Sequence, residues 1–225
     1  MSDFTTWRSL VDGEEIGVIP DSENLHAQYD ATQSESITTE NGSVTQWDDL
    51  SGNDHHLTGS ATGTTTIGTN NAVAFDSDKM DVTFDSISTP YTIYILIEEH
   101  FAASTTEFML DGATDADNTI LQDSGDSWRI DFGGGVTGSA TGSGVLLLDV
   151  VVDGTNDLFE NGSEVVSDES GDNPLAGITI GDRAAGGGPA TFDAGEILYY
   201  DTAHDASTVS EVRDYIESKW PVTIS

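Results

Sequence analysis

Short apolar runs with a period of two recur along this chain, and turn-forming residues separate them. Alternation places every second side chain on one face of a strand, and clusters of Gly, Asn, Asp and Ser favour tight turns. The clearest alternating runs span residues 25–29, 72–75, 80–84 and 128–132. Two longer runs, residues 91–97 and 145–152, are apolar on both faces, so we expect central strands there. The pattern predicts an all-β chain folded as a two-sheet antiparallel sandwich.

One short helix is expected near the C-terminal end of the sequence. Residues 208–219 carry apolar side chains on one face, and Thr208 with Glu211 matches the capping box that begins many helices. A hairpin is expected at Asn161-Gly162, because this dipeptide between alternating apolar residues favours a type I′ turn. These signals add a hairpin and a C-terminal helix to the predicted sandwich.

The charge of the chain excludes several classes of partner. It has 41 Asp and Glu residues against 6 Lys and Arg, a formal net charge of -35. A nucleic-acid footprint requires a basic patch, which six cations among so many carboxylates cannot form. The same charge disfavours an anionic membrane surface, and no apolar run approaches the length of a membrane-spanning helix. We therefore expect no nucleic-acid partner and no membrane insertion.

The charge also points to a habitat. With 36% hydrophobic residues, the chain has enough apolar material for a packed core and does not read as a disordered acidic segment. A compact domain of this charge repels itself in dilute buffer, whereas at molar salt the Debye length falls to about 3 Å. We infer a halophilic protein from a hypersaline habitat, either haloarchaeal or from a virus of such a host.

The first residues of the chain differ from the rest, because apolar side chains occur there without strand alternation. Left exposed, they would form a costly apolar patch. Two interpretations stay open: an arm packed on its own domain, or a docking arm buried in a neighbouring subunit. We divide the chain into an N-terminal docking arm, residues 1–20, and a β-sandwich domain, residues 21–225. The candidate docking residues are Phe4, Trp7, Leu10 and Ile16.

Several segments, taken in order, resemble a known family. They are the opening strand at residues 25–31, the V-T-Q-W-D-D-L-S-G-N segment at 44–53 with His55 or His56 after it, Pro90–Ile95, Val152–Gly154 with Asn161-Gly162, Glu196–Asp201, and the Y-I-E-S-K-W end at 215–220. Over residues 20–225 the chain resembles a concanavalin A-like lectin/glucanase domain of the laminin-G-like type. The resemblance implies a jelly-roll sandwich of the kind seen in archaeal and bacterial surface and virion proteins.

Catalytic signatures are missing from the sequence. The glucanase branch of the family carries E-x-D-x-E on one strand, which places carboxylates together for nucleophile and acid. No such pentad occurs, and Asp81 and Asp85 are four positions apart with apolar residues between them. The chain has no cysteine, which excludes thiol catalysis and disulfides, and it shows no Ser-His-Asp arrangement. We therefore expect a protein that is not an enzyme.

One acidic loop offers ligands for a metal ion. Relatives of the laminin-G type often hold Ca²⁺ at one rim, and Ca²⁺ takes six to eight oxygen ligands. The candidate ligands here are Asp111, Asp115 and Asp117. A solvated acidic loop is the alternative in so acidic a chain, and Ca²⁺ is the one cofactor we consider.

Sugar recognition requires an aromatic platform with planar polar groups beside it. Trp47, Trp128 and Trp220 fall on expected core faces or at core positions of the resembling family. Polar loop residues are then the candidate ligand contacts. They are Asp111, Asn118, Arg129 and Arg183. For Arg183, an ion pair with a neighbouring Asp is the simpler alternative.

These observations lead to an expected function. We expect a non-enzymatic, lectin-like attachment component, as a virion structural protein (tail fibre, spike, turret or capsid decoration) of a haloarchaeal virus. The start at Met1 without an export signal favours the virion surface over a secreted lectin. The expected partners are other virion proteins through the N-terminal arm, host glycan or S-layer glycoprotein, and further copies in a homo-oligomer. The alternatives are a purely structural decoration without a ligand, or a cellular halophilic glycan-binding module.

Overall fold

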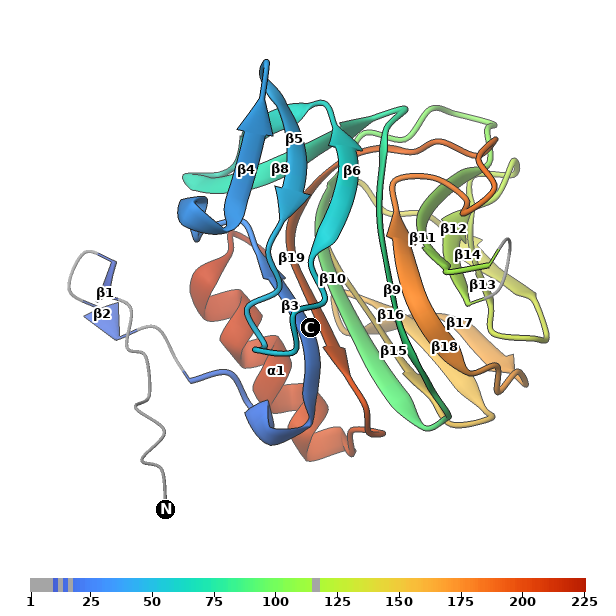
Figure 1. The fold of residues 1–225 in the computed structure, drawn as a ribbon. Helices are drawn as coiled ribbons and strands as arrows, with labels where there is room; N and C mark the ends of the chain where they lie inside the picture. Colours follow the sequence, from blue (N-terminus) through green and yellow to red (C-terminus); the bar gives the residue numbers. More distant parts are fainter. Residues whose placement is uncertain (1–9, 12–13, 16–17, 115–117) are drawn as a thin grey trace.

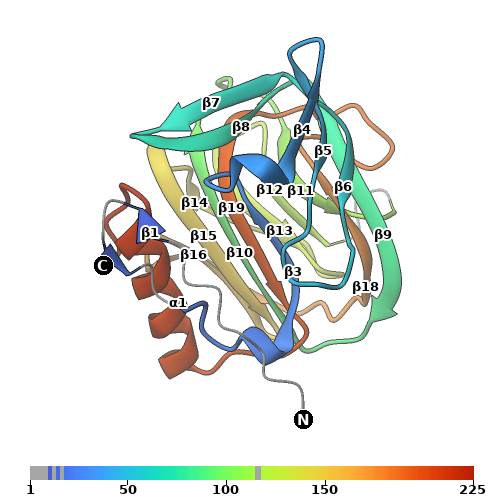
Figure 2. The same ribbon diagram turned by 60° about the vertical axis from the view of Figure 1, so that its left-hand side comes forward.

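The computed structural model describes residues 10–11, 14–15, 18–114 and 118–225. Within them, two large antiparallel sheets pack face to face, and one helix lies against the outer face of one sheet (Figure 1, Figure 2). The predicted all-β, two-sheet antiparallel sandwich with one short C-terminal helix is confirmed. None of the described helices is both long and apolar enough to cross a membrane.

The eight-stranded sheet carries the helix and is called here the helix-side sheet. Strand β19 is central in this sheet, because it pairs with three other strands. The order is β17 (Ser163–Glu169), β16 (Asn156–Glu160), β15 (Gly144–Val152), β10 (Tyr91–Glu99), β19 (Thr191–Tyr200), β8 (Asn70–Asp76) and β7 (Gly63–Ile67), with β3 (Leu25–Asp30) also paired to β19.

The nine-stranded sheet is called here the far sheet. Its order is β14 (Val136–Ala140), β13 (Ser127–Asp131), β12 (Thr119–Gln122), β11 (Glu107–Gly112), β18 (Leu175–Ile180), β9 (Lys79–Ile87), β6 (Leu57–Ala61), β5 (Ser43–Trp47) and β4 (Ile37–Glu40). A separate pair, β1 (Leu10–Val11) and β2 (Glu14–Glu15), precedes the sandwich, and two short 3-10 turns span Ser22–Asn24 and Ser34–Ser36.

The core explains why two runs of the sequence are apolar on both faces. On β10, Ile93 and Ile95 point between the sheets, whereas Tyr94 and Leu96 pack under the helix. The β15 run is likewise buried on both sides, with Leu148 inside and Leu147 under the helix. Both are central strands, as predicted, because the helix gives the outer face of their sheet a second apolar layer.

The three predicted core tryptophans are confirmed as core. Trp47 and Trp128 are fully buried between the sheets, and Trp220 is 2% exposed under the helix. The predicted hairpin is also confirmed, since β16 and β17 join through Asn161-Gly162, both with positive φ as a type I′ turn requires.

Helix α1 (Ala206–Lys219) begins two residues before the predicted position. Its N-cap is Asp205, whose Oδ1 accepts bonds from the Thr208 backbone N–H at 2.9 Å and hydroxyl at 3.0 Å. The predicted capping box is therefore wrong. A carboxylate three residues earlier already satisfies the exposed N–H group of the first turn.

A buried polar group, the Glu196 cluster, lies between the helix and its sheet. Glu196 accepts hydrogen bonds from the Tyr215 hydroxyl at 2.9 Å, Lys219 Nζ at 2.8 Å and Trp220 Nε1 at 2.8 Å. Lys219 Nζ also lies 2.7 Å from the Asp30 carboxylate. Burial raises the pKa of the Glu196 carboxyl above its usual range, although Lys219 opposes this shift. The cluster fixes the helix to strands β3 and β19.

Another buried carboxylate, Glu169 at the end of β17, holds two loops together. Its Oε1 accepts bonds from the backbone N–H groups of Gly134, Gly135 and Gly171, and its Oε2 accepts one from the Asn156 side chain. The side chain is fully buried. These charge-assisted bonds attach the loop after β13 in the far sheet to the helix-side sheet.

Glu169→Gln is therefore expected to lower the free energy of unfolding by about 2 kcal/mol, because the amide keeps one acceptor oxygen and turns an N–H₂ toward donors. Urea unfolding followed by circular dichroism at constant molar KCl measures the change. The matched control is Asp168→Asn, at the exposed neighbouring residue, which should change the free energy by less than about 0.5 kcal/mol. Equal effects of the two variants would contradict the role assigned to Glu169.

Candidate functional site

The first of the three candidate calcium ligands, Asp111, does not lie in a loop as predicted. Asp111 lies inside strand β11, paired with Thr179 of β18, and is fully buried. Its Oδ1 accepts the Gly112 N–H at 2.9 Å and its Oδ2 accepts the Ala184 N–H at 2.9 Å. The prediction that Asp111 is a loop residue is wrong, because pairing with β18 extends the strand through it. Asp115 and Asp117 lie outside the described residues.

The other predicted ligand contacts lie in separate surroundings. Asn118 is buried, accepts the Tyr91 hydroxyl at 3.0 Å and donates to the Pro174 carbonyl at 3.1 Å, so it too is not an exposed loop residue. The prediction that Arg129 is a loop residue is also wrong, because it lies within strand β13; it is partly exposed and pairs with Asp131 at 3.2 Å. The guanidinium carbon of Arg183 lies 5.4 Å from the centre of the Phe108 ring.

The structure thus brings together one part of the predicted set, Asp111 and the loop that carries Arg183. Among the candidate docking residues, Leu10 falls in the small strand β1. Phe4, Trp7 and Ile16 lie outside the described residues.

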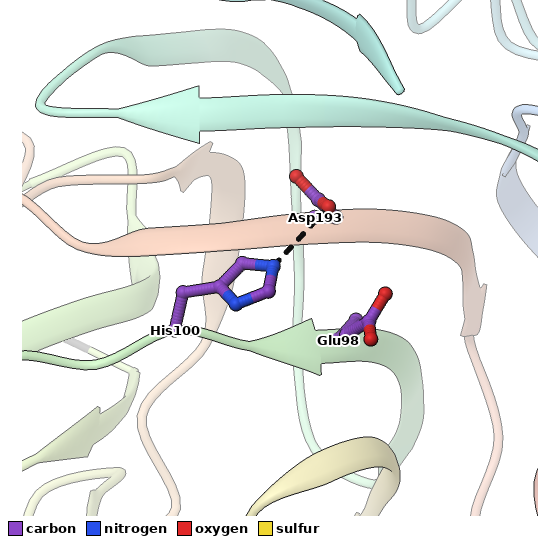
Figure 3. A group of neighbouring side chains, drawn as sticks. All are labelled: Glu98, His100 and Asp193. Atoms are coloured by element: carbon purple, nitrogen blue, oxygen red, sulfur yellow. Dashed lines mark hydrogen bonds and ion pairs between the residues drawn. The ribbon is translucent and has the colours of Figure 1, made fainter. Parts of the chain in front are cut away.

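A group of possible metal ligands, which the sequence reasoning missed, lies on the outer face of the helix-side sheet (Figure 3). Glu98 of β10 and Asp193 of β19 are opposite each other in the strand register, and His100 follows β10. The three ligand atoms lie within 4.8 Å of one another, and His100 Nε2 is 3.3 Å from Asp193 Oδ2. One imidazole and two carboxylates could hold a divalent cation. The spacing of Glu98 and His100 was the available signal, but Asp193 comes from a distant strand.

A second group, the aromatic rim, consists of His26, His55, Phe84 and Tyr199. His26 and Tyr199 come from the helix-side sheet, Phe84 comes from β9 of the far sheet, and His55 comes from the loop between β5 and β6. Both histidines and Phe84 are partly exposed, whereas Tyr199 is 1% exposed. The rim therefore lies where the space between the sheets approaches solvent.

The rings of the aromatic rim contact one another closely. The centre of the His26 ring is 4.5 Å from that of His55 and 4.8 Å from that of Phe84. The His55 and Phe84 ring centres are 5.0 Å apart, and Tyr199 lies beneath, 5.9 Å from Phe84 and 5.4 Å from His26. Partly exposed rings in contact form the kind of platform on which an apolar face of a ligand can stack.

Asp49 holds the loop that carries His55. Its carboxylate accepts the backbone N–H groups of Gln28 at 2.9 Å, Ser51 at 2.9 Å and His55 at 3.1 Å. The neighbouring His56 has a structural role, because its Nδ1 accepts the Asp49 N–H at 3.1 Å. These bonds fix the backbone of the loop from which the His55 ring projects.

Two polar atoms of the aromatic rim are buried without a hydrogen-bond partner among the described residues. They are the Tyr199 hydroxyl oxygen and His26 Nε2. Burial, together with the nearby His55, lowers the pKa of His26, so its ring is neutral at neutral pH. A neutral imidazole nitrogen and a phenol hydroxyl can both exchange hydrogen bonds with a bound group.

Comparisons with known proteins are informative for the fold. No protein-family model matches the chain, and no curated protein matches it. Among solved structures, Trypanosoma rangeli sialidase aligns with a TM-score of 0.63 at 12% identity, over 94% of this chain and 36% of the sialidase chain. This chain therefore spans about a third of the length of that enzyme.

Two other solved structures align over most of this chain. Domain 4 of AbnA, a GH43 extracellular arabinanase from Geobacillus stearothermophilus in complex with arabinotriose, has a TM-score of 0.60 at 17% identity, over 84% of this chain and 98% of that domain. A structure of botulinum neurotoxin type C aligns with a TM-score of 0.61 at 11% identity, over 86% of this chain and 51% of the toxin chain. Cell entry of that toxin is described as dependent on interaction with two ganglioside molecules. At these identities the similarity establishes a shared sandwich fold and no more. This fold is consistent with the predicted concanavalin A-like sandwich.

Proposed function

We propose that this chain is a non-enzymatic carbohydrate-binding module that contacts sugar at the aromatic rim. The observation that carries the proposal is the set of contacting rings, of which His26, His55 and Phe84 are partly exposed, together with two buried polar atoms of the rim that have no partner in the described part of the chain. Aromatic rings stack on the apolar face of a sugar, and a few converging polar groups fix its orientation. The arabinotriose bound to the arabinanase domain and the gangliosides of the neurotoxin support the same class of ligand.

The proposal assigns no glycoside hydrolysis at the rim to the Glu98 and Asp193 carboxylates. A retaining glycosidase places two carboxyl groups about 5–5.5 Å apart across the bond that breaks. Glu98 and Asp193 come this close, but Asp193 pairs with His100. Their strand neighbours Ile97 and Ala194 lie in the core between the sheets, so Glu98 and Asp193 point to the outer face of the sheet. Tyr199 of the rim pairs with Ile93, five positions earlier on β10 than Glu98, and faces the core. The carboxylate pair and the aromatic platform therefore do not share one substrate.

The finer proposal is a host-attachment component on the surface of a haloarchaeal virion, with residues 1–20 docked to other virion proteins, in a homo-oligomer. The formal net charge of -35 supports the hypersaline setting. Deleting residues 1–19 should abolish assembly while the sandwich stays folded by circular dichroism. Assembly unchanged by the deletion would count against the docking arm.

The test of carbohydrate binding is calorimetric titration of neutral oligosaccharides into the protein at about 3 M KCl. We expect saturable binding, weakened about tenfold by Phe84→Ala, because the variant removes the central ring of the platform. The matched control is Phe101→Ala, since Phe101 is also partly exposed but packs edge-to-face against Trp128. Repeating the titration with EDTA tests the proposal that Ca²⁺ takes part.

Absence of binding to every sugar in the panel would contradict the proposed function and favour a purely structural decoration. Equal weakening by Phe84→Ala and Phe101→Ala would keep a carbohydrate-binding function but move it away from the aromatic rim. Circular dichroism of both variants establishes that each is folded before its affinity is compared.

A further inference from the structure

We infer that the aromatic rim selects an uncharged sugar and receives one of its hydroxyl groups between Tyr199 and His26. The inference rests on the proposed function and names the ligand class for the same site. It separates this chain from its structural neighbours, some of which are described with sialic acid or gangliosides.

The first step concerns the two buried polar atoms. Tyr199 is 1% exposed, and its hydroxyl oxygen has no hydrogen-bond partner among the residues that the structure covers. His26 Nε2 is in the same condition, and the two rings are 5.4 Å apart between centres. Native proteins pair nearly all buried polar atoms with protein, water or ligand. Because two such atoms occur in contacting rings, we infer that a polar group of a ligand binds there.

The second step is the chemistry of that group. A phenol donates one hydrogen bond and accepts others, and a neutral imidazole nitrogen either donates or accepts. An alcohol hydroxyl can donate to one atom and accept from another at once, so we expect one sugar hydroxyl to serve both atoms. A carboxylate can only accept, so it satisfies both atoms only when His26 is the Nε2–H tautomer, whereas a hydroxyl group suits either tautomer. The pair thus matches a hydroxyl group better than an acid group.

The third step is the charge around the aromatic rim. Asp54 precedes His55 and is 92% exposed at its side chain, and Asp85 follows Phe84 and is exposed. Asp49 and Asp201 lie close enough to act electrostatically on His26. An anionic sugar would meet negative charge from the loop after β5, from β9 and from the residue that follows β19.

The cations of the described chain have their contacts elsewhere. Lys79 donates to the Ala184 carbonyl, Arg129 pairs with Asp131, Arg183 lies over Phe108, Arg213 pairs with Asp149, and Lys219 pairs with Asp30 and Glu196. A sialic acid carboxylate recognised in proteins normally receives charge-assisted bonds from such groups. The rim therefore favours uncharged sugars over acidic ones.

The experiment compares Tyr199→Phe with Tyr200→Phe. Tyr200 is the next residue on β19, faces the helix, and donates its hydroxyl to the Pro20 carbonyl at 3.1 Å. The probes are arabinotriose, lactose and cellotriose as neutral sugars, with 3′-sialyllactose and trigalacturonic acid as acidic ones, titrated by calorimetry at about 1 M KCl. Urea unfolding of each variant is measured in the same buffer.

We expect wild-type binding to at least one neutral probe, with acidic probes at least about tenfold weaker. Tyr199→Phe should weaken the neutral sugar about tenfold without lowering stability, because its hydroxyl has no partner to lose in the free protein as described. Tyr200→Phe should lower stability and leave affinity unchanged. A merely structural Tyr199 would give no loss of affinity.

Two results would overturn the inference and leave the carbohydrate-binding function standing. One is preference for the acidic probes, and the other is wild-type affinity in Tyr199→Phe. Failure of the wild-type protein to bind any probe would instead defeat the proposed function, and the inference with it.

Discussion

Lys219→Met is expected to lower the free energy of unfolding by about 3–5 kcal/mol at neutral pH, because it leaves two buried carboxylates without their cation. The Glu196 side chain is fully buried, and those of Asp30 and Lys219 are each 5% exposed. The variant keeps the unbranched, apolar part of the side chain and removes the ammonium group. Urea unfolding at about 3 M KCl, followed by far-ultraviolet circular dichroism, measures the loss.

The loss should depend on pH in one direction. Burial already raises the pKa of Glu196 above its unfolded value, and removal of Lys219 raises it further. A carboxyl with a raised folded pKa destabilises the fold above its unfolded pKa. This penalty shrinks as the pH falls below the folded pKa and is gone below the unfolded pKa. The difference between variant and wild type should therefore shrink on acidification.

The matched control is Lys79→Met, since Lys79 is also partly buried but donates to the Ala184 carbonyl rather than to a carboxylate. It should cost no more than about 1.5 kcal/mol and show no such pH dependence. A loss below about 1 kcal/mol for Lys219→Met, or one that grows on acidification, would contradict the assigned role of the ammonium group.

Dilution from about 3 M to about 0.05 M KCl is expected to remove most of the stability of the fold. The Debye length grows from under about 3 Å to more than 10 Å over this range, so exposed carboxylates that are screened at high salt begin to repel one another. Helix α1 shows the arrangement, because Glu211, Asp214 and Glu217 are all exposed and three positions apart. Circular dichroism and urea unfolding across the salt series measure the effect.

Sucrose separates screening from general stabilisation by excluded solutes, because it is excluded from protein surfaces but carries no charge. At low salt we expect NaCl to restore folding and sucrose to restore much less of it. Full stability at 0.05 M KCl, or equal rescue by sucrose, would contradict an adaptation to high salt.

The sequence predicted the layers of the fold well, because strand alternation is a local property that states which face is buried. Residues 91–97 are apolar on both faces, and both faces are covered. The start of helix α1 was predicted two residues too late, because Thr208 and Glu211 match the capping-box pattern. The actual N-cap, Asp205, acts alone and has no partner residue that would mark it in the sequence. Asp205 and Thr208 are both residue types that favour the N-cap position, so the sequence alone did not choose between them.

The candidate site could not be predicted in the same way. The aromatic rim joins residues from β3, β9, β19 and the loop after β5, and no spacing in the chain connects them. Asp111 was misplaced because the residues after it favour turns, while its pairing with Thr179 depends on a strand far along the sequence. Positions set by long-range pairing leave no periodic signal.

The pairing of β19 also constrains when the molecule can fold during synthesis. This strand lies between β10 and the strands β3 and β8, so segments made early have no neighbour on that side until residues 191–200 have left the ribosome. Until then β10 exposes an apolar edge and two apolar faces. Contacts between residues far apart in the sequence form slowly, and the apolar surface that stays exposed meanwhile favours aggregation of the nascent chain. Biogenesis of this protein should therefore depend on chaperones that hold the chain until its sheet can close.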